Sequence, residues 1–489
     1  MDITLKTEDL FTTIGLEIHV ELNTVSKMFC GCAVGFGGEP NTRVCPVCLG
    51  HPGTLPVPNG KAIEFATKIS MALGCEIAPR SIFHRKNYFY PDMPKNYQIS
   101  QYDIPIGSGG FLDVDLDGVV HRVGITRVHL EEDTGKSLHI GGGGRIHDAE
   151  YSLEDFNRAG TPLVEIVTEP DITSAEVARA FAQELRLILE FLGVSDVQMQ
   201  EGSLRIDANI SVAREGERGT KAEVKNMNSM RSVLRALLYE EQRQREVLQG
   251  DGVLEQSTRH WDEKAGVTQP LRTKEFAFDY RYFPEPDLVP IEPSVEWLRQ
   301  LTEEIPEVPA ERRKRLVAEM NLTAYDAGVV SSSRAIADFY DAAVGAARSS
   351  TPKQVANWMS NQLAGLLSEA KQSLAEAKIS PRSFAALVDA VSGGDLSRVH
   401  GNEVLIEMLA TGHESDAIIK DKGFGETTDR GAVESVVDDV LSANPDVVAR
   451  LKSGDSKPMG FLVGLIMKAT RGQANPITVR EILDLRLKD

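Results

Sequence analysis

The stretch IGLEIHVEL, Ile14–Leu22, alternates strictly between apolar and polar residues. Apolar side chains occupy every second position, and Glu17, His19 and Glu21 lie between them. Because successive side chains of a strand point to opposite faces, the pattern predicts a β-strand with one buried face and one polar face. Taken alone, the polar row also fits a solvated strand face, so its role depends on the neighbouring strands.

Further alternating segments and turn signals continue to about Pro293. The segment GFLDVDLDGVVHRVGITRVHLEED carries an Asp-Gly turn at Asp117-Gly118, which is typical of a β-hairpin. A helix with a capping box over Thr173–Glu176 is predicted to end at Gly193. Strands with few crossover helices predict an α+β fold with a mainly antiparallel sheet.

The sequence pattern changes from strand-like to helical at FPEPDLVPIEPS, which contains four prolines between Pro284 and Pro293. Beyond it helical signals dominate, such as the helix start Thr351-Pro352-Lys353-Gln354. We therefore predict three domains: a domain built on the sheet over residues 1–293, an all-α helical domain over residues 294–405 and a small α-helical tail domain over residues 406–489.

Charge and hydropathy limit the function classes. The net charge of −19 argues against a protein whose whole surface binds nucleic acid. A local basic patch fits, because residues 451–489 carry seven Lys and Arg against four Asp and Glu. The longest apolar run noticed, Met459–Met467, is too short to span a bilayer, and the N-terminus shows no signal peptide. These features predict a cytoplasmic protein without membrane association.

Four of the five cysteines, Cys30, Cys32, Cys45 and Cys48, form the pattern C-x-C-x₁₂-C-x₂-C. Four thiolates in two close pairs fit a tetrahedral metal site, and zinc is its usual occupant. Such a site leaves no coordination position open, so the predicted zinc is structural. Four reduced cysteines without metal are the alternative.

Carboxylates also lie within other predicted strands, namely Glu131 and Glu132 in VHLEED, Glu165 in PLVEIVT and Asp207 in RIDAN. Carboxylates in strand centres are costly unless they are paired or bind a cation. Together with an imidazole they favour Mg²⁺ and phosphoryl chemistry. Alternation groups Glu131 with His129, whereas a β-bulge would present both Glu131 and Glu132 on one face.

Long motifs in this chain resemble one family. They are TTIGLEIHVEL, YFYPDMPKNYQISQYD, VHLEEDTGK, NRAGTPLVEIVTEPD, GSLRIDANISV, KAEVKNMNS, DYRYFPEPDLVPIEP and, near the C-terminus, GFLVGLIMKATRGQANP. In this order they resemble the B subunits of bacterial aspartyl/glutamyl-tRNA amidotransferases. The chain has no P-loop and none of the G-x-S-x-G or S-x-x-K motifs of an amidase nucleophile.

The resemblance implies a ligase that forms carbon–nitrogen bonds with glutamine as amide donor. Its substrate would be misacylated Glu-tRNA(Gln) or Asp-tRNA(Asn), whose side-chain carboxylate is phosphorylated with ATP and Mg²⁺ and then amidated. Ammonia would come from a separate amidase (glutaminase) partner, and a third, small protein would complete a heterotrimer. An amidase on a separate chain agrees with the absence of a nucleophile motif in this one.

The resemblance also implies roles for the domains and for particular residues. Residues 1–293 would form the catalytic cradle domain with the zinc-binding insert, and residues 406–489 would form the C-terminal tRNA-binding tail domain. It assigns the magnesium site to Glu17, His19, Glu132 and Glu165. It assigns catalysis and ammonia entry to Glu131, Glu132 and Glu165, with Asp207 as a further candidate. In the basic tail we expect tRNA phosphate contacts at Lys457, Lys468 and Arg471.

Two other function classes stay open from the residues. One is a zinc-containing RNA-binding protein without catalysis, which has no reason to gather carboxylates and histidine around one point. The other is a metal-dependent phosphatase, which leaves the basic tail without a purpose.

Overall fold

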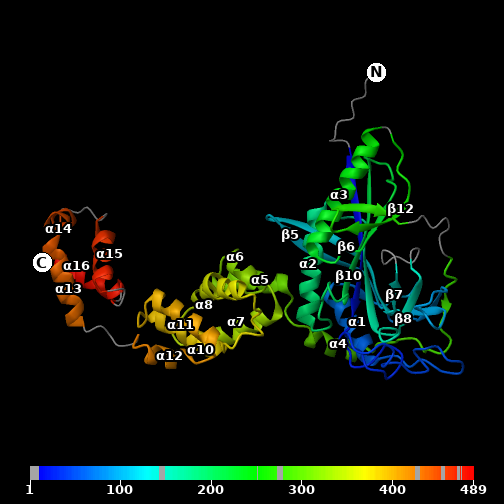
Figure 1. The fold of residues 1–489 in the computed structure, drawn as a ribbon, viewed down its shortest axis with the longest axis horizontal. Helices are drawn as coiled ribbons and strands as arrows, with labels where there is room; N and C mark the ends of the chain where they lie inside the picture. The colour runs from blue at the N-terminus through cyan, green and yellow to red at the C-terminus, as the bar shows by residue number, and fades with distance from the viewer. Residues whose placement is uncertain are drawn as a thin grey trace, which may run out of the picture. The chain divides into compact units, whose positions relative to one another are not determined.

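The computed structural model describes residues 10–141, 149–250, 252–271, 279–424, 430–452, 458–470, 474 and 476–488. The chain forms two compact units, Met1–Val308 and Pro309–Asp489. The first unit contains all the strands of the described residues, and the second contains helices (Figure 1). This arrangement confirms the predicted α+β fold class.

The first unit is built from fourteen described strands and four described helices. The strands are β1 (Leu10–Glu21), β2 (Glu76–Ile77), β3 (His84–Asn87), β4 (Tyr97–Ser100), β5 (Gly107–Leu116), β6 (Val119–Glu132), β7 (Lys136–Ile140), β8 (Tyr151–Asp155), β9 (Pro162–Thr168), β10 (Leu204–Arg214), β11 (Ala222–Lys225), β12 (Ser257–Asp262), β13 (Val267–Pro270) and β14 (Phe283–Pro284). The helices are α1 (Gly60–Ala72), α2 (Ala175–Leu192), α3 (Met230–Gln249) and α4 (Val295–Glu304).

A nine-stranded sheet forms the centre of this unit, in the order β13-β12-β11-β10-β1-β9-β6-β5-β2. Only the pair β11–β12 is parallel among the described strands. The predicted hairpin joins β5 and β6, and both Asp117 and Gly118 have the positive φ that a tight hairpin turn needs. β1 lies between β10 and β9, so the opening stretch of the sequence forms the middle of the sheet.

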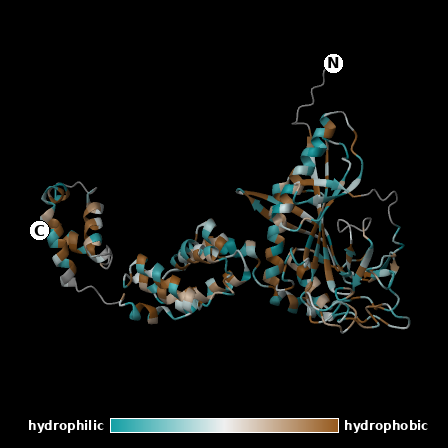
Figure 2. Ribbon diagram, viewed as in Figure 1, coloured by the Kyte–Doolittle hydropathy of each residue, from teal (hydrophilic) through white to brown (hydrophobic). Residues whose placement is uncertain are grey.

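The core of the unit lies on the apolar face of this sheet. Ile14, Ile18 and Val20 of β1 are fully buried there, together with side chains of α1, α2 and α3, as the alternation predicted. Brown, apolar residues accordingly follow the central strands in Figure 2. The helix α2 ends at Gly193 as expected, but its N-cap is Ser174, whose hydroxyl accepts a hydrogen bond from the Val177 N–H. The predicted capping box over Thr173–Glu176 is therefore wrong, because valine at the third position has no side-chain acceptor.

Two smaller sheets complete the first unit. β14, β3 and β4 form a three-stranded sheet beside the end of β6, and β7 and β8 form a two-stranded ribbon. The three-stranded sheet brings residues near position 283 against residues near 85 and 99, far apart in the sequence. It supplies several of the side chains that surround the polar face described below.

The second unit is helical. Its helices are α5 (Pro309–Met320), α6 (Ala324–Val329), α7 (Arg334–Ala346), α8 (Pro352–Trp358), a π-helical turn η3 (Met359–Leu363), α9 (Ala364–Ala370), α10 (Pro381–Gly393), α11 (Arg398–Thr411), α12 (Ser415–Asp421), α13 (Arg430–Ala443), α14 (Pro445–Lys452), α15 (Met459–Ala469) and α16 (Pro476–Lys488). The capping box predicted at Thr351 and Gln354 is present at the start of α8.

Two hydrophobic clusters lie in this unit. One runs from Leu316 to Ile418 in sequence, and the other from Val433 to Leu483. The predicted domain limit after residue 405 falls inside α11, whose Leu405 packs in the first cluster. The division into three domains stays a prediction, and these clusters favour a limit between the helical and tail domains that lies after α12.

Candidate active site

A row of polar side chains crosses the middle of the sheet. His19 of β1 lies opposite Glu165 of β9, and Glu165 lies opposite His129 of β6. On the other side of β1, Arg205 of β10 is the register partner of His19. Antiparallel pairing places register partners on the same face, so four consecutive strands contribute one polar residue each to a continuous row.

The members of this row are close enough to act together. The Nε2 atoms of His19 and His129 both lie 3.4 Å from Glu165 Oε2, and His129 Nε2 lies 3.1 Å from Glu131 Oε1. Ligand atoms of His19, Glu131 and Glu165 all lie within 4.8 Å of one another. The alternation of β6 placed His129 beside Glu131, but no sequence signal placed His129 against Glu165.

Electrostatics keep these carboxylates ionised. Although burial raises the pKa of Glu165, His129 and His19 hold it well below its ordinary value. Burial alone would lower the pKa of His129, but the charges of Glu165 and Glu131 raise it to about 9. The two buried carboxylates Glu131 and Glu165 with the His19 imidazole form a donor set that fits a divalent cation, with the carboxylate oxygens as the hard ligands that Mg²⁺ prefers.

Strand β4 fixes the orientation of Glu131. The Ser100 hydroxyl donates to Glu131 Oε1 over 2.6 Å, and the Gln98 amide donates to Oε2 over 3.2 Å. Both carboxylate oxygens are therefore held in place within a buried site. Positioning of this kind lowers the cost of ordering the side chain when it binds a ligand.

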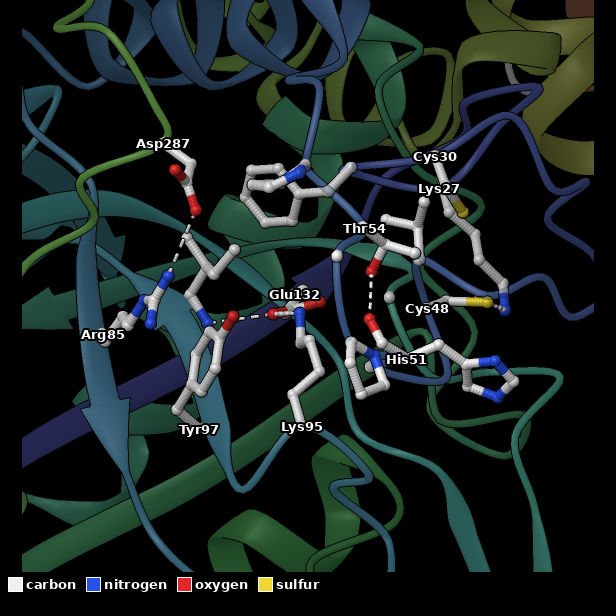
Figure 3. Close-up of a pocket in the computed structure, with 18 residues that line it drawn as sticks. Lys27, Cys30, Cys48, His51, Thr54, Arg85, Lys95, Tyr97, Glu132 and Asp287 are labelled. Atoms are coloured by element: carbon white, nitrogen blue, oxygen red, sulfur yellow. Dashed lines mark hydrogen bonds and ion pairs between the residues drawn. The ribbon is translucent and has the colours of Figure 1, made fainter.

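Glu132 points to the opposite face of the strand. It forms an ion pair with Lys95 and accepts a hydrogen bond from the Ile99 N–H over 2.9 Å. It lines a cavity of about 230 Å³ that Lys27, Cys48 and other residues also line (Figure 3). The irregularity of β6 lies between Ile125 and Arg127 and not at the glutamates, so strict alternation separates Glu131 from Glu132.

Glu17 and Asp207 lie in the neighbouring row of the same face. They are register partners across β1 and β10. Asn209 Nδ2 donates to Glu17 over 3.0 Å, and Lys225 Nζ lies 2.7 Å from Asp207. Within the described residues, neither belongs to the group formed by His19, Glu131 and Glu165.

Glu21 is half-buried beside a second charged group. Burial and the charge of Asp133 raise the pKa of Glu21. Arg205 lies 2.7 Å from Asp133, and Arg158 lies 3.6 Å from it. Burial alone would raise the pKa of Asp133, but the two guanidinium groups lower it. Glu21 is therefore part of a charged network and not a solvated side chain.

The four predicted zinc ligands come together. The sulfurs of Cys30, Cys32, Cys45 and Cys48 all lie within 4.8 Å of one another. Four thiolates about 2.3 Å from a tetrahedral zinc ion require sulfur separations near 3.8 Å. Cys45 Sγ and Cys48 Sγ are 3.9 Å apart, so the cluster fits zinc with little adjustment.

Of the three predicted tRNA contacts in the tail, the structure describes one. Lys468 lies in the last turn of α15 with its side chain exposed. Lys457 and Arg471 lie outside the described residues. No helix in the described part of the chain is long and apolar enough to cross a membrane.

Comparisons with known proteins identify the class first. Residues 12–299 match the family model of the GatB/GatE catalytic domain, and residues 338–487 match that of the GatB domain. The chain is therefore one component of an amidotransferase, a ligase-type enzyme.

Curated relatives define the family more narrowly. The B subunit of the aspartyl/glutamyl-tRNA(Asn/Gln) amidotransferase of Moorella thermoacetica is 50% identical over 476 residues, 97% of this chain and 99% of the relative. The proteins of the same name from Carboxydothermus hydrogenoformans and Frankia casuarinae are 49% and 50% identical, over 96% and 97% of this chain and 97% and 95% of each relative. The chain belongs to the family of aspartyl/glutamyl-tRNA(Asn/Gln) amidotransferase B subunits.

Proposed function

We propose that this protein activates the side-chain carboxylate of a misacylated tRNA, Glu-tRNA(Gln) or Asp-tRNA(Asn), and converts it to the amide. A carboxylate oxygen attacks the γ-phosphorus of ATP, ADP leaves and an acyl phosphate forms. Ammonia then attacks the acyl carbon, and phosphate leaves with the attacking oxygen. Without the first step the carboxylate is a poor acyl donor, which explains why ATP is required.

The observation that carries this proposal is the grouping of His19, Glu131 and Glu165 on one face of the sheet. These residues would hold Mg²⁺, with His129 supporting Glu165 and Glu131. The metal would supply neutralisation of the phosphate charge during transfer. The residues themselves hold the site in position, since Ser100 and Gln98 orient Glu131 before any ligand arrives.

Glu132 has a separate task in this proposal. Its cavity lies on the other face of the same strand, lined by polar and cationic side chains including Lys95 and Lys27. We assign to this cavity the entry of ammonia, as the family resemblance implies. Glu132 would then act on the nucleophile, while Glu131 acts on the phosphoryl donor and the metal.

The proposed chemistry and the family resemblance support two protein partners. An amidase partner would release ammonia from glutamine, and a third, small protein would join the amidase to this chain in a heterotrimer. The tail would bind the tRNA backbone, with Lys468 as an exposed phosphate contact. Zinc would hold the four cysteines and stabilise the insert without taking part in turnover.

The test uses the assembled enzyme with ATP, Mg²⁺, ammonium and Glu-tRNA(Gln). ADP and Gln-tRNA should appear together, and only with the charged tRNA. Glu165→Gln should reduce both products roughly hundred-fold or more while tRNA binding survives. Tight tRNA binding without ADP above the level seen with uncharged tRNA would contradict the proposal and favour a binding protein without catalysis.

A further inference from the structure

Three tyrosines form an aromatic cluster beside the small sheet. The rings of Tyr102 and Tyr282 are stacked, with centroids 4.4 Å apart and planes 13° from parallel. Tyr280 meets Tyr282 edge-on, with centroids 6.1 Å apart. Tyr102 follows β4, and Tyr282 directly precedes β14, so chain segments 180 residues apart build the stack.

This cluster lies next to the candidate active site. In the register of the small sheet, Lys86 of β3 is the partner of Gln98 of β4, and Gln98 donates to Glu131. Tyr282 comes one residue before Phe283, the register partner of Arg85. Tyr282 is therefore one strand further from Glu131 than Lys86 on the small sheet, and Tyr102 follows β4, whose Gln98 and Ser100 contact Glu131.

Lys86 lies near both the carboxylates and the tyrosines. Its Nζ is 5.1 Å from the centroid of the Tyr280 ring, a cation–π contact. In the described part of the chain no carboxylate lies within 4 Å of Nζ. Although burial lowers the pKa of Lys86, the charges of Glu131 and other neighbours raise it, so the ammonium stays protonated. A protonated lysine without a carboxylate partner is suited to an incoming anionic group.

One ring of the stack is exposed, and the other is half-buried. Tyr102 is 57% exposed. Across the described residues, no hydrogen bond ties the hydroxyl group of Tyr102 or Tyr282 to the protein. The exposed ring of Tyr102, stacked on the half-buried ring of Tyr282, offers a surface on which a nucleobase of any identity can stack. A cation beside the rings adds an attachment point for the phosphate or ester group joined to that nucleoside.

We propose that Tyr102 and Tyr282, with Lys86 beside them, bind the adenosine of a substrate next to His19, Glu131 and Glu165. The inference rests on the proposed function, in which both ATP and the 3′-terminal nucleotide of the aminoacyl-tRNA carry an adenosine. The sequence contains no P-loop motif. Stacking on aromatic side chains would bind the base without such a motif.

The experiment measures direct binding to the assembled enzyme. Two probes carry 2-aminopurine, whose fluorescence falls on stacking: its riboside triphosphate in place of ATP, and Glu-tRNA(Gln) with 2-aminopurine as the terminal base. Tyr282→Ala and Tyr102→Ala should each raise Kd for one probe about five-fold or more and reduce its quenching. KM for the corresponding substrate should rise with it, and kcat should change little.

Controls separate stacking from general damage. Tyr282→Phe keeps the ring and should bind both probes within two-fold of the unaltered enzyme. Tyr325→Ala removes an exposed tyrosine of the helical unit and should change neither Kd. Because Tyr102 is largely exposed, its truncation leaves the fold intact even if the Tyr282 variant does not fold.

The outcomes are distinct. A response of the triphosphate probe alone assigns the platform to ATP, and a response of the tRNA probe alone assigns it to the terminal adenosine; both support the inference. Unchanged Kd and quenching for both probes in Tyr102→Ala and Tyr282→Ala would overturn it. Failure of the proposed function looks different, because the unaltered enzyme would then release no ADP with charged tRNA.

Discussion

Glu131 and Glu132 are neighbours in the chain, yet their carboxylates lie on opposite faces of β6. Glu131 contacts His129 and Ser100, and Glu132 contacts Lys95 and the Ile99 N–H. Two carboxylates with separate surroundings are suited to separate tasks. In the proposed reaction these tasks are activation of the substrate and delivery of ammonia.

Replacing Glu131 and replacing Glu132 should therefore impair amide formation at two different steps. Glu131→Gln should abolish ADP release that depends on charged tRNA, because the phosphoryl-transfer site loses a charge. Glu132→Gln should retain this ADP release while amide formation falls at least ten-fold. Rapid-quench measurement of ADP and Gln-tRNA in one reaction gives both quantities. Equal loss of ADP release in the two variants would show that the faces of the strand do not divide the chemistry.

The cysteine cluster should contribute to stability more than to turnover. Cys45→Ser removes one of four thiolates, and we expect a lower melting temperature and sub-stoichiometric zinc. Turnover per folded molecule should change less than two-fold. Zinc content by atomic absorption, thermal unfolding and an activity titration measure the three quantities. Cys75→Ser, at a buried cysteine outside the cluster, is the matched control. A well-folded but inactive Cys45→Ser protein would contradict a structural role.

Asp389 should make a pH-dependent contribution to the helical unit. Partial burial alone would raise the pKa of its carboxylate, but hydrogen bonds from the N–H groups of residues 348–350 lower this pKa to about 2. An ordinary aspartate has a pKa near 3.9, so the stabilisation is complete above about pH 4 and is lost as pH falls through about 2.

Asp389→Asn should therefore cost about 1 kcal/mol of unfolding free energy at pH 7, a value reduced for solvent screening. The difference from the unaltered protein should shrink below pH 4. Urea unfolding at pH 7, 4 and 3 measures it. Asp395→Asn changes an exposed carboxylate in the loop after the same helix and should have little effect at any of these pH values. A difference that persists at pH 3 at full size would exclude the carboxylate as its cause.

Lys468 should contribute to tRNA affinity through charge alone. Lys468→Glu should weaken binding of charged and uncharged tRNA alike, and Lys468→Gln should reduce the slope of log K against log salt by roughly one. Filter binding from 50 to 200 mM salt measures both effects. Lys420→Glu, at a lysine in α12 of the helical unit, is the charge-matched control. An unchanged slope would leave Lys468 as a solvated side chain.

The sequence predicted the elements with regular patterns. Alternation over Ile14–Leu22 gave the buried and polar faces of β1, and the Asp117-Gly118 turn gave the β5–β6 hairpin. Cysteine spacing gave the four-thiol cluster. Each of these patterns depends on local geometry, which sequence spacing reports directly.

Contacts between distant strands were not predicted in the same way. Strand order brings His129 onto Glu165 and separates Glu17 from the group, and spacing within one strand holds no information about its neighbours. The same holds for the Tyr102–Tyr282 stack, because its two halves lie in different segments of irregular backbone. The partner of Glu21, Asp133, was visible in the sequence, but only the folded structure shows that the two carboxyl groups interact.

The most direct test of the central claim follows the oxygen of the substrate carboxylate. Glu-tRNA(Gln) labelled with ¹⁸O in the glutamate side chain is converted by the assembled enzyme, and the released phosphate is analysed by mass spectrometry. Activation as an acyl phosphate predicts one ¹⁸O atom in phosphate for each amide formed, and none with Glu131→Gln, which should release no phosphate. Amide formation with unlabelled phosphate would contradict the account, because ATP would then not have activated this carboxylate.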